Sequence, residues 1–149
     1  MEDSQADRPS GRAQLEAMVA AGLNSPIGKT LGFKLTEIGP GFAAFEGTPG
    51  RAVYNPIGTV HGGYAATLLD SACWCAVHSQ LHATQAHTTL ELKVSYHHAL
   101  TDMSGMVRAE GHLLSMGRRV AFAEAKLTDS KGRLYASATS TLLIFERRT

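Results

Sequence analysis

Long hydrophobic runs are absent from this sequence, and no apolar stretch reaches the ~18 to 20 residues that a membrane-spanning helix requires. The first residues, MEDSQADRPSGR, are polar and begin with acidic side chains, which is the opposite of a secretory signal. An excess of charge of one sign is also lacking, because 14 basic and 13 acidic residues give a net charge of +1. This balance gives no electrostatic reason to expect nucleic acid or a membrane surface as a partner.

Cysteine is scarce, since the chain has only Cys73 and Cys75. On a helix their side chains would point about 200° apart, so neither a disulfide nor a joint metal site is expected. Reduced thiols and a cytoplasmic location are the simplest interpretation. His78 and His82 have i, i+4 spacing, but no Asp or Glu lies near them in the sequence. A solvated surface is expected at these histidines, and no metal is predicted.

The feature around which the chain is organised is a stretch, residues 64–77, that is almost wholly apolar or small and lacks Gly and Pro. A helix that is apolar on all sides is one that other elements surround. Asp70 is its only charged residue, and a buried carboxylate is costly unless it is paired or functional. His61, Gly62 and Gly63 open this helix, where glycines let backbone N–H groups approach another molecule closely.

Patterning along the chain predicts one domain over residues 13–149, after a disordered leader over residues 1–12. Helical spacing predicts a short amphipathic helix over residues 13–23, and the central helix is expected to end near residue 79. The sequence Ser-Pro-Ile-Gly at 25–28 is interpreted as a turn. Alternation predicts six strands, over residues 31–38, 42–48, 90–96, 105–114, 120–128 and 134–145.

This order of elements predicts an α+β domain in which a curved, mostly antiparallel sheet of about six strands wraps one long central helix. Because the last four strands follow one another, we expect them to form an antiparallel meander. The apolar residues at even positions from 90 to 96 are expected to share one face of their strand. The alanines at 121, 123 and 125 are expected where the sheet lies close against the helix.

Together these features resemble the hotdog-fold acyl-CoA thioesterases of the PaaI-like type, over about residues 28–146. The likeness consists of Asn55, then His61-Gly62-Gly63, then Asp70, then Thr-Leu-Glu-Leu-Lys-Val-Ser-Tyr at 89–96, then Gly117-Arg118, and then Asp129 with Gly132-Arg-Leu. Each piece alone is weak, but all of them in order at these spacings form a strong signal. The chain departs from its relatives at His97-His98-Ala99, where they often carry Leu-Arg-Pro.

The resemblance implies roles for the residues that match. Asp70 would act as the general base or the nucleophile, and the Gly62 backbone N–H would polarise the thioester carbonyl. Asn55 would help to position water or substrate. Thr89 would hold the attacking water, and Thr88, one register away, is the alternative.

Several of the candidates also have a structural alternative. His61 would act in the chemistry, or it would only hold the loop by hydrogen-bonding a backbone carbonyl. Asn55 could simply start the turn before Pro56. The candidates for substrate and CoA contacts are Gly63, Trp74, Arg118, Arg119 and Arg147. Trp74 is either core or a wall of the acyl pocket, and the arginines are either solvated strand ends or contacts to the CoA phosphates.

The chemistry fits these residue types, because thioester hydrolysis needs a donor aimed at the developing oxyanion and a base within reach of water. A helix N-terminus offers unpaired N–H groups and a favourable dipole. Eight residues separate Gly62 from Asp70, roughly 12 Å along one helix, which is too far for both to act on one carbonyl. We therefore expect a site shared between two chains of a homodimer, and the resemblance implies further assembly to a homotetramer.

Three functions from different classes are compatible with the sequence. The leading prediction is hydrolysis of an acyl-CoA to free acid and CoA, without metal or other cofactor. A hotdog hydratase or dehydratase is less favoured, because those relatives have a longer interval between their His and their acid. A non-catalytic acyl-CoA binding or sensing module is disfavoured only by the presence of Asp70. The acyl group is not identified, because pocket residues come from loops and from two chains.

Overall fold

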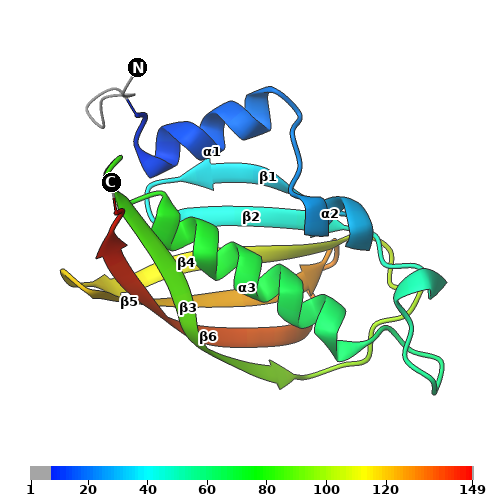
Figure 1. Ribbon diagram of the computed structural model, residues 1–149. Helices are drawn as coiled ribbons and strands as arrows, with labels where there is room; N and C mark the ends of the chain where they lie inside the picture. The colour runs from blue at the N-terminus through cyan, green and yellow to red at the C-terminus, as the bar shows by residue number, and fades with distance from the viewer. Residues whose placement is uncertain (1–7, 149) are drawn as a thin grey trace.

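The long helix α3, Gly62–His78, lies across one face of a curved antiparallel sheet in the computed structural model, which describes residues 8–148 (Figure 1). The strands are β1 Phe33–Gly39, β2 Phe42–Gly47, β3 Gln85–Tyr96, β4 Val107–Met116, β5 Val120–Asp129 and β6 Leu134–Glu146. The predicted arrangement of one central helix wrapped by six strands is confirmed. Among the residues described there is no helix with the length and apolarity needed to cross a membrane.

The order of the strands, β1-β2-β4-β5-β6-β3, differs from the prediction in the place of one strand. β4, β5 and β6 form the expected meander, but β3 pairs with β6 and lies at the edge of the sheet. The prediction of a four-strand meander is therefore wrong for β3. The reason is the link between β3 and β4, residues 97–106, which is long enough to cross the end of the sheet instead of making a hairpin.

Two short helices precede the sheet. Helix α1, Gly11–Ala20, begins two residues before its predicted start, and the side chain of Ser10 caps it by accepting the Ala13 N–H at 3.3 Å. Part of the predicted disordered leader thus belongs to this helix, while residues 1–7 lie outside the described part of the chain. The Gly11 N–H donates to the Leu81 carbonyl at 3.1 Å, which fixes the start of α1 beside the end of α3.

The segment interpreted as a turn at residues 25–28 is instead the start of helix α2, Pro26–Leu31. Ser25 caps it by accepting the Gly28 N–H at 3.1 Å, and proline occupies the first turn, where its missing N–H costs nothing. The prediction of a turn is wrong because a serine followed by proline is also the usual start of a helix. A short 3₁₀ helix, η2, Arg51–Val53, lies in the loop that leads to α3.

Small residues beneath α3 allow the helix to lie close to the sheet. A Cβ atom on Gly111 of β4 would overlap the carbonyl oxygen of Ala72, so only glycine fits there. The alanines at 121, 123 and 125 on β5 are all at most 2% exposed, as predicted for a face packed against the helix. Leu68 and Leu69 of α3 are fully buried in the core that this contact creates.

A bulge in β3 decides which of its side chains face α3. The register with β6 shifts immediately after Thr89 and leaves Leu90 as the extra residue. Thr89 and Tyr96 are seven positions apart and would face opposite ways on a regular strand, yet both hydrogen-bond to α3. Leu90 is 59% exposed, so the prediction that it shares a face with residues 92–96 is wrong. Alternation in the sequence does not reveal a bulge.

Three aromatic rings stack where β3 packs on the second half of α3. The Trp74 ring centroid lies 4.8 Å from that of His78 and 4.1 Å from that of His87. His82 is exposed as predicted, but His78 is only 5% exposed. The prediction of a solvated His78 is wrong because α1 and β3 cover the end of the helix.

Hydrogen bonds assign the proton of both buried histidines to Nε2. His87 Nε2 donates to the Trp74 carbonyl at 3.0 Å. Gln14 Nε2 donates to the backbone carbonyl five residues before it, so Gln14 Oε1 accepts from His78 Nε2 at 3.3 Å. His78 Nδ1 is left buried without a partner among residues 8–148. Burial is the main cause that lowers the pKa of His78 to about 4, and it also lowers the pKa of His87.

We predict a dependence of stability on pH that originates at His78. Its folded-state pKa of about 4 lies below the unfolded value, so the unfolded chain binds more protons between about pH 6.5 and 4. Stability from this group is complete above about pH 6.5 and falls by up to about 3 kcal/mol as the pH drops towards 4. His78→Phe keeps an aromatic ring in the stack but cannot be protonated, so it should flatten this slope.

Urea unfolding across this pH range, at one protein concentration, measures the effect. His82→Phe is the matched control, because the exposed His82 should leave the slope as in the wild type. An equally steep slope in the His78 variant would show that the acid sensitivity has another origin.

Candidate functional site

Asp70 is half-buried on α3 and is held from β3. Thr89 Oγ1 donates to Asp70 Oδ1 at 3.0 Å, while Thr88 is exposed on the opposite face of the strand. The structure thus brings Thr89, and not Thr88, to the carboxylate. Within residues 8–148 no hydrogen bond reaches Asp70 Oδ2, so this oxygen is available to another molecule.

The start of α3 leaves one of its two glycine N–H groups free. His61 is the residue before the helix, and its Nδ1 accepts the Gly63 N–H at 2.8 Å. His61 therefore holds the helix start, although through an N–H and not through the carbonyl that was expected. None of the described residues accepts a hydrogen bond from the Gly62 N–H. Gly62 thus offers a free donor at a helix N-terminus, where the dipole favours negative charge.

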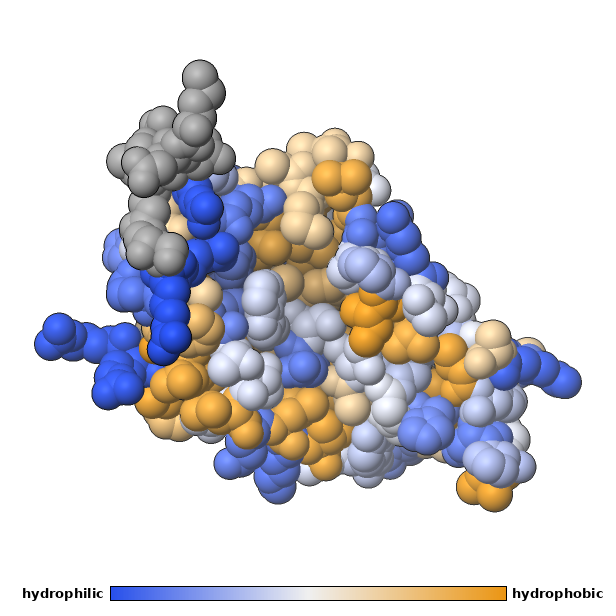
Figure 2. All heavy atoms as spheres, viewed as in Figure 1, coloured by the Kyte–Doolittle hydropathy of each residue, from blue (hydrophilic) through white to orange (hydrophobic). Residues whose placement is uncertain are grey.

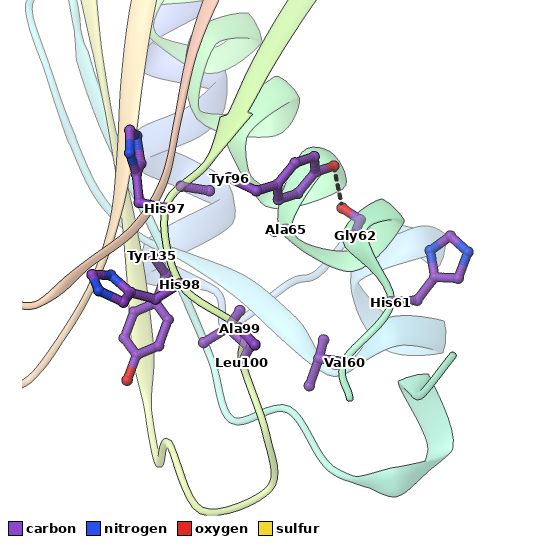
Figure 3. Close-up of a pocket in the computed structure, with 11 residues that line it drawn as sticks. Val60, His61, Gly62, Ala65, Tyr96, His97, His98, Ala99, Leu100 and Tyr135 are labelled. Carbon is purple, nitrogen blue, oxygen red and sulfur yellow. Dashed lines mark hydrogen bonds between the residues drawn. The ribbon is translucent and has the colours of Figure 1, made fainter. Parts of the chain in front are cut away.

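Tyr96 packs against this helix start (Figure 3). Its hydroxyl donates to the Gly62 carbonyl at 2.8 Å, and a Cβ atom at Gly62 would lie only 3.0 Å from the Tyr96 ring. The two residues help to line a hollow of about 360 Å³, and Figure 3 shows them with His97 and Tyr135, which also line it. The end of β3 therefore fixes the position of the free N–H group.

Asp70 opens into a different cavity from Gly62. This second cavity has a volume of about 350 Å³ and lies between α1, α2 and α3, with Leu15, Ile27 and Trp74 among its walls. Asp70 and Gly62 are eight residues apart on one rigid helix, roughly 12 Å along its axis. One chain therefore does not bring both groups to a single carbonyl.

Asn55 is engaged within its own turn. Its Oδ1 accepts the N–H groups of Ile57 and Thr59, both at 3.1 Å, and its Nδ2 donates to Thr59 Oγ1 at 2.8 Å. These hydrogen bonds are those expected if Asn55 starts the turn before Pro56. No hydrogen bond in the described part of the chain joins Asn55 to Asp70 or Gly62, and contact with a substrate remains a prediction.

The arginine candidates lie together at another place. Arg118 and Arg119, in the β4–β5 turn, line a hollow of about 580 Å³ beside the end of β6. Arg147 follows β6, and its Nε donates to the Gln85 carbonyl at 3.0 Å. Neither turn arginine lines the cavity of Asp70, and contact with CoA phosphates remains a prediction.

Tyr96 and the N-terminal helices are the parts of the site that the sequence analysis missed. Leu15 of α1 and Ile27 of α2 help to enclose the cavity of Asp70. The Ser-Pro pair that begins α2 was a signal for this helix. The reach of Tyr96 to Gly62 depends on the bulge in β3, which no sequence signal marks.

The cysteines do not contribute a nucleophile. Cys73 and Cys75 are buried and unpaired by disulfides, and burial is the main cause that raises the pKa of each thiol to about 12. Both are therefore thiols and not thiolates at neutral pH. Within residues 8–148 no group of three or more His, Cys, Asp or Glu side chains is arranged to hold a metal ion.

Comparison with known proteins identifies the family. The family described as "Thioesterase superfamily" matches residues 57–136, which is more than half of the chain. The chain belongs to the thioesterase superfamily. The matched region of this thioesterase contains the whole of α3 and β3, and with them the Asp70–Thr89 hydrogen bond and the Gly62 N–H.

Individual relatives agree with this assignment. A 1,4-dihydroxy-2-naphthoyl-CoA hydrolase from Listeria monocytogenes is 22% identical over 120 residues, covering 80% of this chain and 96% of that protein. A mutant of the phenylacetic acid degradation protein PaaI from Thermus thermophilus has a TM-score of 0.72 and 27% identity, covering 80% and 98% of the two chains. A thioesterase family protein from Silicibacter pomeroyi has a TM-score of 0.80 and 25% identity, covering 93% and 100%. The predicted PaaI-like hotdog fold is confirmed.

The two neighbouring threonines of β3 allow a matched test of the contact to Asp70. Thr89→Val keeps the shape of the side chain but removes the hydrogen bond to the carboxylate, and we expect thioester turnover to fall by about tenfold. Thr88→Val, on the opposite face, should change turnover by less than about twofold. Steady-state assays of thiol release measure both, and equal effects of the two substitutions would contradict the assigned contact.

Proposed function

We propose that this protein hydrolyses an acyl-CoA thioester to the free acid and CoA at a site shared between two subunits. The observation that carries the proposal is the half-buried Asp70, held by Thr89, with an oxygen left free beside an apolar cavity. Membership of the thioesterase superfamily supports the reaction class, and the similarity to a naphthoyl-CoA hydrolase supports a CoA thioester as the substrate.

The open edge of the sheet supports a dimer. β1 and β3 are the two edge strands, and α1 and α2 pack against β1. β3 is a twelve-residue edge strand on which Leu90 is 59% and Tyr96 is 56% exposed. A long edge strand with exposed apolar side chains favours pairing with another chain. We propose that β3 pairs with β3 of a second copy.

Antiparallel pairing of the two copies would also assemble the site. A two-fold axis between Leu92 and Lys93 sets Thr89 of one chain opposite Tyr96 of the partner subunit. The partner's Gly62, which hydrogen-bonds to the partner's Tyr96, then approaches the Asp70 that Thr89 holds. Each dimer would contain two such sites.

The proposed reaction uses these two groups in turn. Asp70 removes a proton from water, and the water oxygen attacks the thioester carbon. Gly62 N–H of the partner subunit donates to the oxyanion of the tetrahedral intermediate, a contribution typically of about 3 kcal/mol. The carbon–sulfur bond then breaks, and the CoA thiolate takes the proton from Asp70. No metal or other cofactor is part of this proposal.

Direct attack by Asp70 on the thioester is the alternative to a general base. It would form an anhydride whose hydrolysis can place solvent oxygen in the Asp70 carboxylate. After a single turnover in ¹⁸O-labelled water, peptide mass spectrometry that finds label in Asp70 would show direct attack, because a general base leaves Asp70 unlabelled.

For assembly beyond the dimer, we propose the homotetramer that the resemblance implies. Leu114 and Phe122 are 55% and 47% exposed on the sheet. We propose these apolar side chains as contacts between two dimers. Light scattering that finds an active, stable monomer would contradict both levels of assembly.

Removal of the Asp70 charge tests the chemistry. Asp70→Asn keeps the size of the side chain but cannot accept a proton from water, so we expect kcat to fall by about 10²-fold or more. Circular dichroism should show an intact fold. Glu37→Gln, the same chemical change on the exposed part of β1, should leave kcat within about twofold of the wild type. A near-normal kcat in Asp70→Asn would refute Asp70 as the base, whereas a wild type without any turnover would favour the non-catalytic binding module.

Complementation between two inactive variants tests the shared site. Gly62→Pro deletes the proposed oxyanion donor, and proline suits the first helical position, where His61 before it is already extended with ψ of 135°. Mixed with Asp70→Asn, it should form dimers in which one of the two sites is intact. With random pairing half of the dimers are mixed, so we expect about a quarter of wild-type turnover.

Gly62→Ala is the control for this experiment. Alanine and proline both add a Cβ atom against the Tyr96 ring, but only proline removes the N–H group. The alanine variant should therefore retain more activity than the proline variant. Mixed dimers that native mass spectrometry detects but that remain inactive would refute the shared site.

A further inference from the structure

The cavity beside Asp70 is enclosed within one chain by the N-terminal helices. Leu15 and Met18 of α1 and Ile27 of α2 face the cavity-forming side of α3, and β1 and β2 contribute Leu35 and Phe45. Figure 2 shows apolar surface hollowed between α1 and α3. A cavity of about 350 Å³ with such walls is suited to an apolar ligand group.

The charge around this cavity restricts the ligand further. Among the described residues that line it, Asp70 is the only charged one. A ligand group with a second carboxylate would meet this charge without a cation to balance it. Uncharged apolar groups gain instead, because each buried methylene typically strengthens binding by about fourfold.

Trp74 lines the cavity next to Asp70 on α3, so a ligand group bound at Asp70 would contact its side chain. It lies four residues after Asp70, on the same face of the helix and about 6 Å further along its axis. Its indole stacks on His78 at a centroid distance of 4.8 Å and is tilted against His87 at 4.1 Å, and the His87 ring also donates to the Trp74 carbonyl. The indole is thus braced from behind by two buried rings.

We propose that Trp74, braced by His78 and His87, is the residue that determines acyl selectivity. The cavity takes the acyl group of the thioester, and the indole limits its length while offering a flat face to a ring. The substrate class is then a CoA thioester of an uncharged, apolar acyl group with a ring or a medium-length chain. This inference rests on the proposed thioester hydrolysis at Asp70.

The fluorescence of Trp74 gives a readout that does not depend on turnover, because this is the only tryptophan in the chain. The Asp70→Asn variant, in which hydrolysis is expected to be blocked, is titrated with phenylacetyl-CoA, hexanoyl-CoA, acetyl-CoA and glutaryl-CoA. Phenylacetyl-CoA and hexanoyl-CoA should shift the emission at concentrations at least tenfold lower than the other two, and free CoA should not shift it. Calorimetric binding of phenylacetyl-CoA without any change in emission would overturn the proposal.

Selectivity in active protein gives the second test. Trp74→Ala should raise kcat/KM for decanoyl-CoA relative to phenylacetyl-CoA by at least tenfold, and Trp74→Phe by less. His87→Ala should shift the ratio in the same direction as Trp74→Ala, because it removes one of the two rings that hold the indole in place. Phe42→Ala removes an aromatic ring that pairs with His112 away from the cavity, and should leave the ratio unchanged.

The outcomes separate this inference from the proposed function. If the wild type hydrolyses none of the thioesters, hydrolysis fails, but an emission shift with phenylacetyl-CoA still supports the cavity as an acyl site. If turnover is normal and the ratio is unchanged in the Trp74 variants, only the role of Trp74 is refuted. Should Trp74→Ala not fold, Trp74→Phe and the fluorescence titration decide.

Discussion

The close contact between α3 and the sheet is the constraint on which the rest of the structure depends. The absence of a side chain at Gly111 and the small faces of the β5 alanines let the helix backbone approach the strands, and this burial fixes the helix in place. Asp70 and Gly62 therefore sit on one rigid element with a fixed separation. Neither group can move to the other, which is why the proposed site requires a second molecule of the protein.

The edge strand β3 contacts both groups whose separation α3 fixes, Asp70 and Gly62. Its bulge turns both Thr89 and Tyr96 towards α3, so one strand holds the acid near its middle and the helix start near its end. The same strand is the open edge of the sheet. Pairing two copies of β3 would both cover exposed backbone groups and bring the two halves of the site together. Stability of the dimer and assembly of the site are then consequences of one contact.

The sequence predicts the features that follow from composition and spacing, and it misses those that follow from the path of the chain. A long stretch of apolar and small residues without Gly or Pro predicts a surrounded helix, so α3 was predicted correctly. The place of β3 was not, because the direction taken by residues 97–106 leaves no local pattern. His78 was expected in water because α1, which buries it, is distant in the sequence. Contacts between distant segments decide such cases.

The group of Trp74 with two histidines departs from the rule that buried polar atoms are hydrogen-bonded. It does so beside the cavity of Asp70, where the two imidazoles support a side chain of the cavity wall. A buried imidazole with an unpartnered Nδ1 is costly, and leucine would fill the same space without that cost. The rings do provide a rigid support behind an indole that faces the cavity of Asp70. Violations of this kind tend to occur at functional sites. Because the support lies behind Trp74 and one turn beyond Asp70, the shape of the cavity can change while Asp70 remains where Thr89 holds it.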